Sequence, residues 1–344
     1  MQRVTVARDL LVNARLLPGE GISVKVRHLV GICTLFVAVT LLAPCGPAGA
    51  RSPRGHGATH HRGATMGTTT TPKTTTTAGP PYQVRTESIT LDDPSRSTPA
   101  RGAVPAKAGR LLVTDVYVPI GAPSPLPLVV FAHGWNSNPG MYDVLLEQWA
   151  GAGFVVAAPV FPDSTDLYPG SPVNDYADQA RDISFIITSL LENPAMDVDR
   201  HRIAVAGHSD GGTDVALLAL DPGFTDRRIR AYLSLSSDMP SGVDPFTPAP
   251  TAGSLFVAVG TSDEYSLYPR STAVYQAAVM PKVLLTEQGG DHLGSFVSAT
   301  PAAAAMRTAT VAFLDRALTP GPVSSNALLA AVQPTGSSLV LAQV

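Results

Sequence analysis

Beyond residue 81 the chain alternates short apolar runs with longer amphipathic segments, and this alternation restricts the possible folds more than any other feature. The short runs are continuously hydrophobic, which is typical of strands covered on both faces of a sheet. Alternation with helices of this length indicates a mostly parallel sheet that has helices on both faces. The sequence therefore predicts an α/β fold, with strands at 111–118, 128–132, 154–160, 203–206, 231–235, 255–259 and 283–285 and helices at 142–150, 176–191, 211–220, 271–279 and 301–318.

The segments that flank this region differ in composition. Residues 1–50 are predicted to be a secretory signal peptide, because basic residues precede the apolar run 29–43 and Ala48-Gly49-Ala50 forms a small-residue cleavage pattern. A single membrane anchor is the alternative, although the run is short for a span. Residues 51–81, rich in Thr, Pro and Gly, predict a disordered linker. A folded domain is then expected over 82–320, followed by a tail at 321–344 that has no clear period.

Cysteine usage and charge exclude several classes of function. Cys33 and Cys45 both lie in the predicted signal peptide, so the exported protein would have no disulfide and no thiolate nucleophile. Pro44 stands where a lipoprotein cleavage box needs a small residue, which argues against a lipid anchor. The net charge of −3, with only 15% charged residues, argues against a nucleic-acid partner. We expect a secreted monomer that binds no metal and has no membrane span after processing.

Gly207-His208-Ser209-Asp210-Gly211 fits the pattern G-x-S-x-G, with an apolar strand before it and a helix after it. This context is the one required of a nucleophile elbow, a turn so tight that the serine adopts strained backbone angles. Glycines on both sides remove the collisions that side chains would make there. The turn would lift Ser209 off the carboxyl edge of the sheet, where ligands bind in open α/β sheets.

A serine hydroxyl needs a base to become a nucleophile, so the hypothesis requires a histidine. His292 follows the last predicted strand and is our candidate. His208 adjoins the serine, but successive residues in such a turn are expected to point apart. His201 precedes the strand, at the opposite edge of the sheet. We therefore predict that His292 is the general base.

The imidazole in turn needs a carboxylate that fixes its tautomer. Asp263 follows the strand at 255–259, and the order Ser209, Asp263, His292 is the order expected of this arrangement. Asp238, which follows the strand at 231–235, is the alternative, because either strand end can reach the histidine. We favour Asp263 because its loop follows the strand that usually carries the acid.

Charge that develops on a substrate oxygen needs backbone N–H donors. The strand at 128–132 ends in His133-Gly134-Trp135, so the N–H groups of Trp135 and Asp210 are the predicted oxyanion hole. The loop between residues 160 and 176 is short and polar, which predicts an open cleft without a helical lid. Trp135, Tyr265, Leu293 and Phe296 are the candidate lining residues.

Five segments carry a resemblance to a known superfamily: PLVVFAHGW, GFVVAAPVFP, DRHRIAVAGHSDGG, LFVAVGTSDE and GGDHLGSF. From Tyr82 to about Leu318 the chain resembles an α/β-hydrolase, and is similar to secreted ester hydrolases grouped with chlorophyllases, platelet-activating-factor acetylhydrolases and cutinase-like polyester hydrolases. The resemblance implies a Ser-His-Asp hydrolase with an oxyanion hole and no cofactor. Polyester hydrolases carry methionine at the position of Asp210, and many have a C-terminal cysteine pair that this chain lacks.

These features together predict a secreted serine hydrolase that cleaves carboxylic esters with short to medium acyl groups through an acyl-enzyme. Its substrate would be a small or lipid-like ester. The same catalytic residues would also allow a peptidase or an amidase. A non-catalytic cell-surface binding protein that retains the fold is a third hypothesis, although the complete set of catalytic residues argues against it.

Overall fold

The computed structural model describes residues 81–170, 172–241, 253–266 and 268–319, together with the backbone of four further strands. The chain divides into two compact units, Met1–Lys73 and Thr74–Val344. In the first unit, β1 (Arg3–Thr5), β2 (Leu11–Leu17) and β3 (Glu20–Lys25) form an antiparallel sheet. The predicted apolar core and cleavage pattern of the signal peptide lie outside the described residues, as do both cysteines and the linker up to residue 80.

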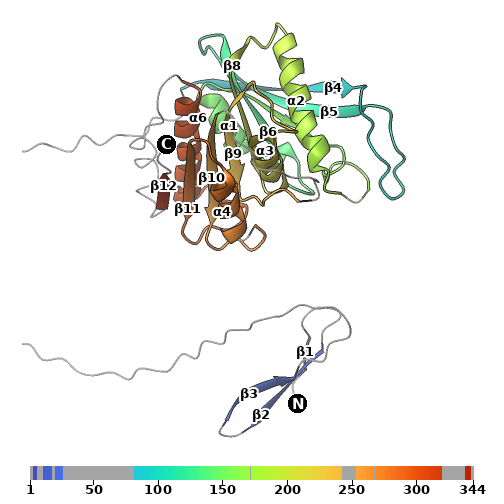
Figure 1. Cartoon of the computed structure of the whole chain (residues 1–344), viewed down its shortest axis with the longest axis vertical. Coiled ribbons are helices and arrows are strands. Elements are labelled where there is room, and N and C mark those ends of the chain that lie inside the picture. The colour runs from blue at the N-terminus through green and yellow to red at the C-terminus, as the bar shows by residue number, and fades with distance from the viewer. Residues whose placement is uncertain are drawn as a thin grey trace, which may run out of the picture. The chain divides into compact units, whose positions relative to one another are not determined.

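In the second unit, the described residues form a nine-stranded sheet with the order β12-β11-β10-β9-β8-β6-β7-β5-β4 (Figure 1). The six strands from β11 to β7 in this order are parallel to one another. The remaining three are antiparallel to their neighbours and lie at the two edges. The strands are β4 (Gln83–Asp93), β5 (Arg110–Ile120), β6 (Leu126–Ala132), β7 (Val155–Pro159), β8 (Val198–His208), β9 (Ile229–Leu235), β10 (Ser254–Gly260), β11 (Lys282–Glu287) and β12 (Ser338–Leu341).

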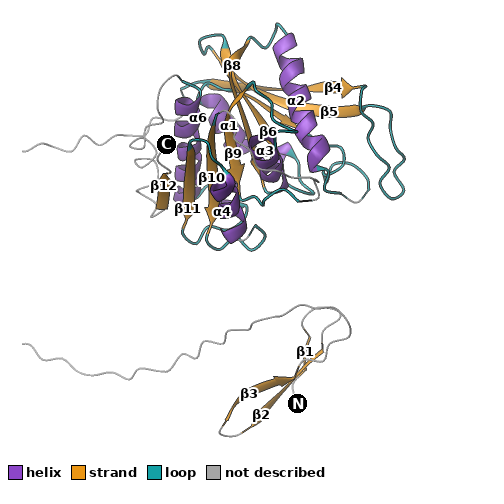
Figure 2. Cartoon of the chain, viewed as in Figure 1, coloured by secondary structure: helices purple, strands orange, loops and turns teal. Residues whose placement is uncertain are grey.

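Helices cover both faces of this sheet (Figure 2). The side chains of α2 (Tyr176–Glu192), α3 (Asp210–Leu220) and α4 (Tyr268–Ala277) pack into one hydrophobic cluster. Those of α1 (Asp143–Gly151), α5 (Gly294–Val297) and α6 (Pro301–Ala317) pack into a second cluster on the other face. A short 3-10 helix, η1 (Pro139–Tyr142), precedes α1. The predicted α/β class, with a mostly parallel sheet between two layers of helices, is confirmed.

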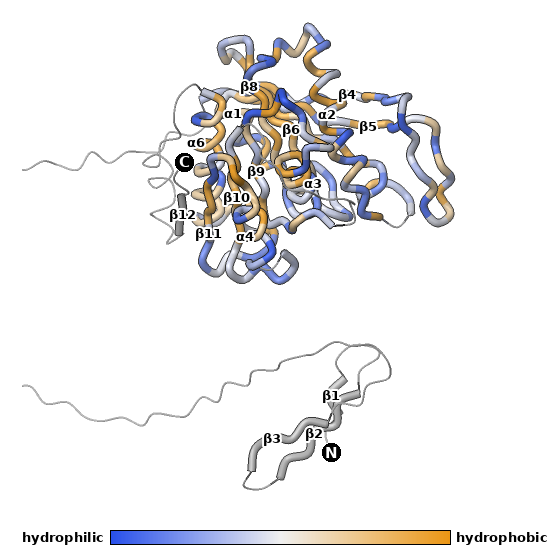
Figure 3. Tube along the Cα trace, viewed as in Figure 1, coloured by the Kyte–Doolittle hydropathy of each residue, from blue (hydrophilic) through white to orange (hydrophobic). Residues whose placement is uncertain are grey.

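The central strands β6 and β7 are hydrophobic along their whole length because both of their faces are covered (Figure 3). Every residue of β6 and of β7 is buried. Along β6, Val129 and Phe131 belong to one cluster, whereas Leu128 and Val130 belong to the other. Because alternate side chains enter two different hydrophobic clusters, these strands show no alternation of polar and apolar residues in the sequence.

Two strands of the nine-stranded sheet, β4 and β12, were not predicted from the sequence. β4 carries polar side chains through much of its length and several of them are exposed, so its apolar pattern is weak. It pairs with β5 over eleven residues at the edge of the sheet. β12 lies in the tail beyond residue 320 and pairs antiparallel with β11. The sheet therefore extends past the position where the sequence predicted the domain to end.

No helix in the described part of the chain combines the length and the hydropathy that a membrane crossing requires.

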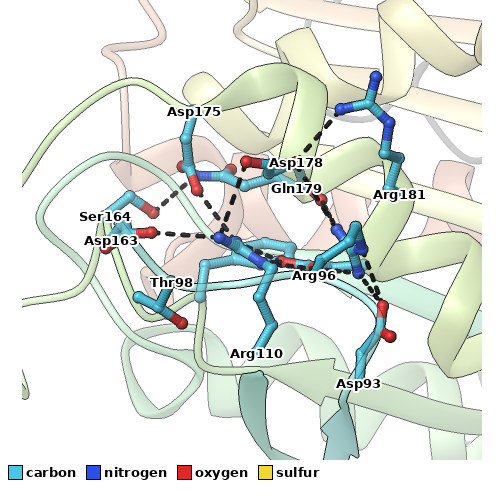
Figure 4. A network of polar contacts seen from close by, with 12 residues as sticks. Asp93, Arg96, Thr98, Arg110, Asp163, Ser164, Asp175, Asp178, Gln179 and Arg181 are labelled. Atoms are coloured by element: carbon cyan, nitrogen blue, oxygen red, sulfur yellow. Dashed lines mark hydrogen bonds and ion pairs between the residues drawn. The ribbon is translucent and has the colours of Figure 1, made fainter. Parts of the chain in front are cut away.

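A buried cluster of arginine and aspartate side chains attaches the β5 edge of the sheet to α2 and to the loop after β7 (Figure 4). Arg110 is fully buried, and its Nε and Nη2 atoms donate to the carboxylate of Asp182 at 2.9 and 2.6 Å. Its two Nη atoms also donate to Asp163 and Asp175 at 3.1 and 3.0 Å. Burial raises the pKa of Asp175 to about 6, against the opposing charge of Arg110. One arginine on β5 therefore binds three carboxylates, one in the loop after β7 and two at α2.

We predict that Arg110→Gln lowers the free energy of unfolding by about 3–5 kcal/mol, because it removes the buried partner of Asp175 and leaves Asp182 with only the partly exposed Arg96. The measurement is chemical denaturation at pH 7.5. The control is Arg85→Gln, since Arg85 forms an exposed ion pair with Glu87 on β4. Loss of an exposed pair costs less than about 1 kcal/mol. Equal effects of the two substitutions would contradict the structural role of Arg110.

Candidate functional site

The turn between β8 and α3 brings Ser209 to the carboxyl edge of the sheet. Ser209 has φ 57° and ψ −121°, a strained conformation for a residue with a side chain. A Cβ atom at Gly207 would lie 2.1 Å from the carbonyl oxygen of Gly211, and one at Gly211 would lie 2.2 Å from that of Ala132. Both positions therefore exclude every residue except glycine, and the sequence pattern around Ser209 follows from backbone contact.

Ser209, His292 and Asp263 form a continuous hydrogen-bonded chain. Ser209 Oγ lies 3.0 Å from His292 Nε2. The opposite ring nitrogen, His292 Nδ1, lies 2.9 Å from each carboxylate oxygen of Asp263. The three residues come from the turns after β8, β11 and β10. This arrangement allows His292 to accept the serine proton while Asp263 fixes the tautomer.

The environment of Asp263 keeps its carboxylate ionised. The side chain is fully buried, and its Oδ1 accepts hydrogen bonds from the backbone N–H groups of Tyr265 and Ser266 at 3.0 and 2.9 Å. Burial alone would raise the pKa of Asp263, but hydrogen bonding from His292 and the backbone outweighs burial and holds the pKa below its usual value. A negative charge is thus maintained beside the imidazole.

Asp238, the alternative acid, occupies a different position. Its Oδ2 accepts from Arg270 Nη1 at 3.2 Å, and 36% of its side chain is exposed. It forms no hydrogen bond with His292 in the structure. Of the two aspartates that the sequence left open, Asp263 is the one that contacts the histidine.

The two predicted oxyanion donors are free of other acceptors. Neither the N–H of Trp135 nor that of Asp210 has an acceptor among the described residues. The turn after β6 lies against the elbow, since a Cβ atom at Gly134 would be 3.2 Å from the Cβ of Ser209. Asn136 has φ 51° and donates its N–H to the carbonyl oxygen of Ser164 at 2.6 Å, which fixes the end of this turn.

The side chain of Asp210 points away from the donors toward α2. Its Oδ1 accepts from the hydroxyl of Tyr176 at 3.0 Å. Burial raises the pKa of Asp210, and the nearby charge of Asp238 raises it further. Asp210 and Asp238 therefore form an acidic patch on the α2 side of the elbow. Asp210 stands at the position where polyester hydrolases carry methionine.

A second hydrogen-bonded chain, which the sequence analysis missed, connects the oxyanion turn to the histidine loop. Tyr142 Oη lies 3.3 Å from the N–H of Gly134 and 2.9 Å from His208 Nδ1. His208 Nε2 lies 2.8 Å from the carbonyl oxygen of His292. Because that carbonyl can only accept, Nε2 carries the proton of neutral His208, and Nδ1 accepts from the tyrosine. The hydroxyl of Tyr142 can then accept from Gly134.

Both histidines behind the site are buried and uncharged. Burial lowers the pKa of His208 to about 3, and the proximity of His292 adds to the effect. The ring of His208 packs between Tyr142 and Phe296, with centroid distances of 5.5 and 5.1 Å. Burial also lowers the pKa of His133 to about 4, and its Nε2 accepts from the backbone N–H of Phe161. The sequence analysis excluded His208 from catalysis, but it did not recognise this supporting position.

The candidate lining residues divide into two groups. Trp135 and Tyr265 are 51% and 68% exposed, and the ring centroid of Tyr265 lies 5.1 Å from that of His292. Leu293 is partly buried against the second cluster. The expectation for Phe296 is wrong, because this residue is fully buried in the core beneath His208. Between β7 and α2 the described residues contain no helix.

Two comparisons with known proteins gave a match. A family model described as Chlorophyllase matches residues 102–250, which is less than half of the chain. Among solved structures, the chain is similar to a ferulic acid esterase from Streptomyces cinnamoneus, with 20% identity and a TM-score of 0.56. The match covers 76% of this chain and 96% of the esterase. Curated protein sequences gave no match. The structural match shows an α/β-hydrolase fold, and the family match supports a carboxylic ester hydrolase.

Proposed function

We propose that the chain is an exported serine carboxylesterase that acts through an acyl-enzyme on Ser209. The observation that carries the proposal is the hydrogen-bonded chain from Ser209 Oγ through His292 to Asp263, with distances of 3.0 and 2.9 Å. His292 removes the serine proton as Oγ attacks the ester carbonyl. The oxyanion then accepts hydrogen bonds from the N–H groups of Trp135 and Asp210.

The first half of the reaction ends when the tetrahedral intermediate collapses. His292 donates its proton to the leaving alcohol, and the acyl group stays on Ser209. In the second half, water loses a proton to His292 and attacks the acyl carbonyl. His292 then returns that proton to Ser209 Oγ, which releases the acid and restores the serine. The carboxylate of Asp263 stabilises the imidazolium that forms in both halves. Export of the mature chain rests on the signal-like composition of residues 1–50.

The substrate that we propose is a small ester with a short or medium acyl group. An open cleft without a lid suits small acids better than long lipid chains. The exposed rings of Trp135 and Tyr265 near the triad can pack against an aromatic acid or alcohol. This preference agrees with the activity of the structural neighbour, a ferulic acid esterase. A graded series of p-nitrophenyl esters, together with methyl ferulate and the matching anilides, tests the proposal. Turnover of anilides without turnover of esters would contradict it.

We predict that Ser209→Ala abolishes ester turnover and leaves the fold intact, because a hydroxyl on a half-exposed residue contributes little to stability. Loss of a triad serine costs several orders of magnitude in kcat. The measurement is kcat with the best p-nitrophenyl ester, together with the melting temperature. If the variant kept more than about a hundredth of the activity, Ser209 would not be the nucleophile.

Asp263→Asn should lower kcat by at least about a hundredfold, the order of a general-base contribution, because the amide cannot hold the required tautomer of His292. Asp238→Asn is the matched control, since its carboxylate pairs with the exposed Arg270 and should affect kcat less than about threefold. Both variants are assayed with the same ester. The reverse pattern would move the acid to the turn after β9.

Tyr142→Phe should lower kcat by about tenfold and change KM little. The substitution removes both hydrogen bonds of the Tyr142 hydroxyl, which position Gly134 and His208. Tyr117→Phe is the control. Tyr117 is also buried, and its hydroxyl donates to Asp143 at 2.7 Å away from the triad. Steady-state kinetics of both variants separate kcat from KM. Equal losses of kcat would show that the Tyr142 hydroxyl acts only through general stability.

A further inference from the structure

A cavity of about 420 Å³ lies at the end of the sheet opposite to Ser209. Its walls come from the last turn of α2, the beginning of β8 and the beginning of β9. Four arginines and one histidine line it: Arg200, Arg227, Arg228, Arg230 and His201. A chain with a net charge of −3 thus gathers a group of cations in one hollow.

Arg228 forms the fixed part of this cavity. Its Nε donates to Asp226 at 2.9 Å, Nη1 donates to the hydroxyl of Thr188 at 2.8 Å, and Nη2 donates to the carbonyl oxygen of Ser184 at 2.9 Å. Asp226 therefore neutralises Arg228, and hydrogen bonds to α2 hold the guanidinium in place. Arg228 therefore forms part of the cavity wall, and the other three arginines are available to bind a ligand.

The other three arginines carry uncompensated charge. Arg200, Arg227 and Arg230 are exposed, and none has an acceptor for its guanidinium within the described ranges of the chain. Glu192 is the one acidic side chain among the described residues that line the cavity. Three cations around one hollow repel one another, and a bound anion would relieve this repulsion.

We propose that this cavity binds an organic phosphate, whose phosphate group is held by Arg200, Arg227 and Arg230. The planar guanidinium fork matches the oxygens of a phosphate and can donate two hydrogen bonds at once. The cavity volume lies in the range of small-molecule sites, which leaves space for an organic part. Leu191 supplies an apolar wall for that part, and His201 a further hydrogen-bonding group.

The proposed site is separate from the esterase site. Arg200 and Ser209 lie at opposite ends of β8, and nine extended residues span about 30 Å. A ligand in the cavity therefore leaves the carboxyl edge of the sheet open to the ester. The proposal does not depend on the identity of the nucleophile, and ester turnover serves as an independent measure of a folded protein.

The test is isothermal titration of the full-length chain with inorganic phosphate and with glycerol 3-phosphate, at pH 7.5 and constant ionic strength set with sodium chloride. We expect saturable binding of both probes, with glycerol 3-phosphate at least as tight as phosphate. The variant R200Q/R227Q/R230Q should bind both at least about tenfold more weakly, which is the cost of one lost charge-assisted hydrogen bond.

The matched control is R85Q/K107Q/R181Q, which removes the same charge from exposed positions outside the cavity. It should keep the affinity of the unsubstituted protein, and all three proteins should hydrolyse the ester at the same rate. Absence of saturable binding in the unsubstituted protein would overturn the proposal, and so would equal weakening in both variants. Tighter binding of phosphate than of glycerol 3-phosphate would overturn the proposal that the ligand has an organic part.

Discussion

The close approach of two backbones, at Gly211 and Ala132, is the contact on which the candidate site depends. A Cβ atom at Gly211 would lie 2.2 Å from the carbonyl oxygen of Ala132, so the start of α3 rests directly on the end of β6. This contact sets Ser209 beside Gly134 and the free N–H of Trp135. Any side chain at residue 211 would push the elbow away from the oxyanion turn.

Parallel strands explain why residues from distant parts of the chain meet at this place. The turns after β6, β8, β10 and β11 all leave the carboxyl edge of one sheet, and each contributes a residue to the site. The buried polar groups behind these turns differ in charge. Asp263 keeps its charge because hydrogen bonds compensate for burial, whereas His133 and His208 stay neutral because burial prevents protonation. Among these buried groups, Asp263 is therefore the charged one, and it is hydrogen-bonded to His292.

Charge is distributed unevenly between the two ends of the strands. Asp210 and Asp238 lie at the carboxyl edge, and the Arg110 cluster that holds the loop after β7 contains more carboxylates than guanidiniums. The amino ends of β8 and β9 carry the unpaired arginines. Burial strengthens the ion pairs of the Arg110 cluster, because a buried ion pair is screened less than an exposed one. The unpaired arginines are exposed and can respond to a ligand.

The amino-acid sequence by itself determined the features that depend on neighbouring residues. Continuous apolar runs identified the central strands because both of their faces are covered, and the pattern around Ser209 follows from a turn that excludes side chains.

Tertiary structure decided the features that depend on contacts between distant residues. Asp238 and Asp263 follow adjacent strands, and only the fold brings Asp263 against His292. The position of His208 was also undecidable, since its partners Tyr142 and His292 lie 66 and 84 residues away. Phe296 carries no local sign of whether an aromatic ring faces a cleft or the core, because burial is a property of the assembled layers.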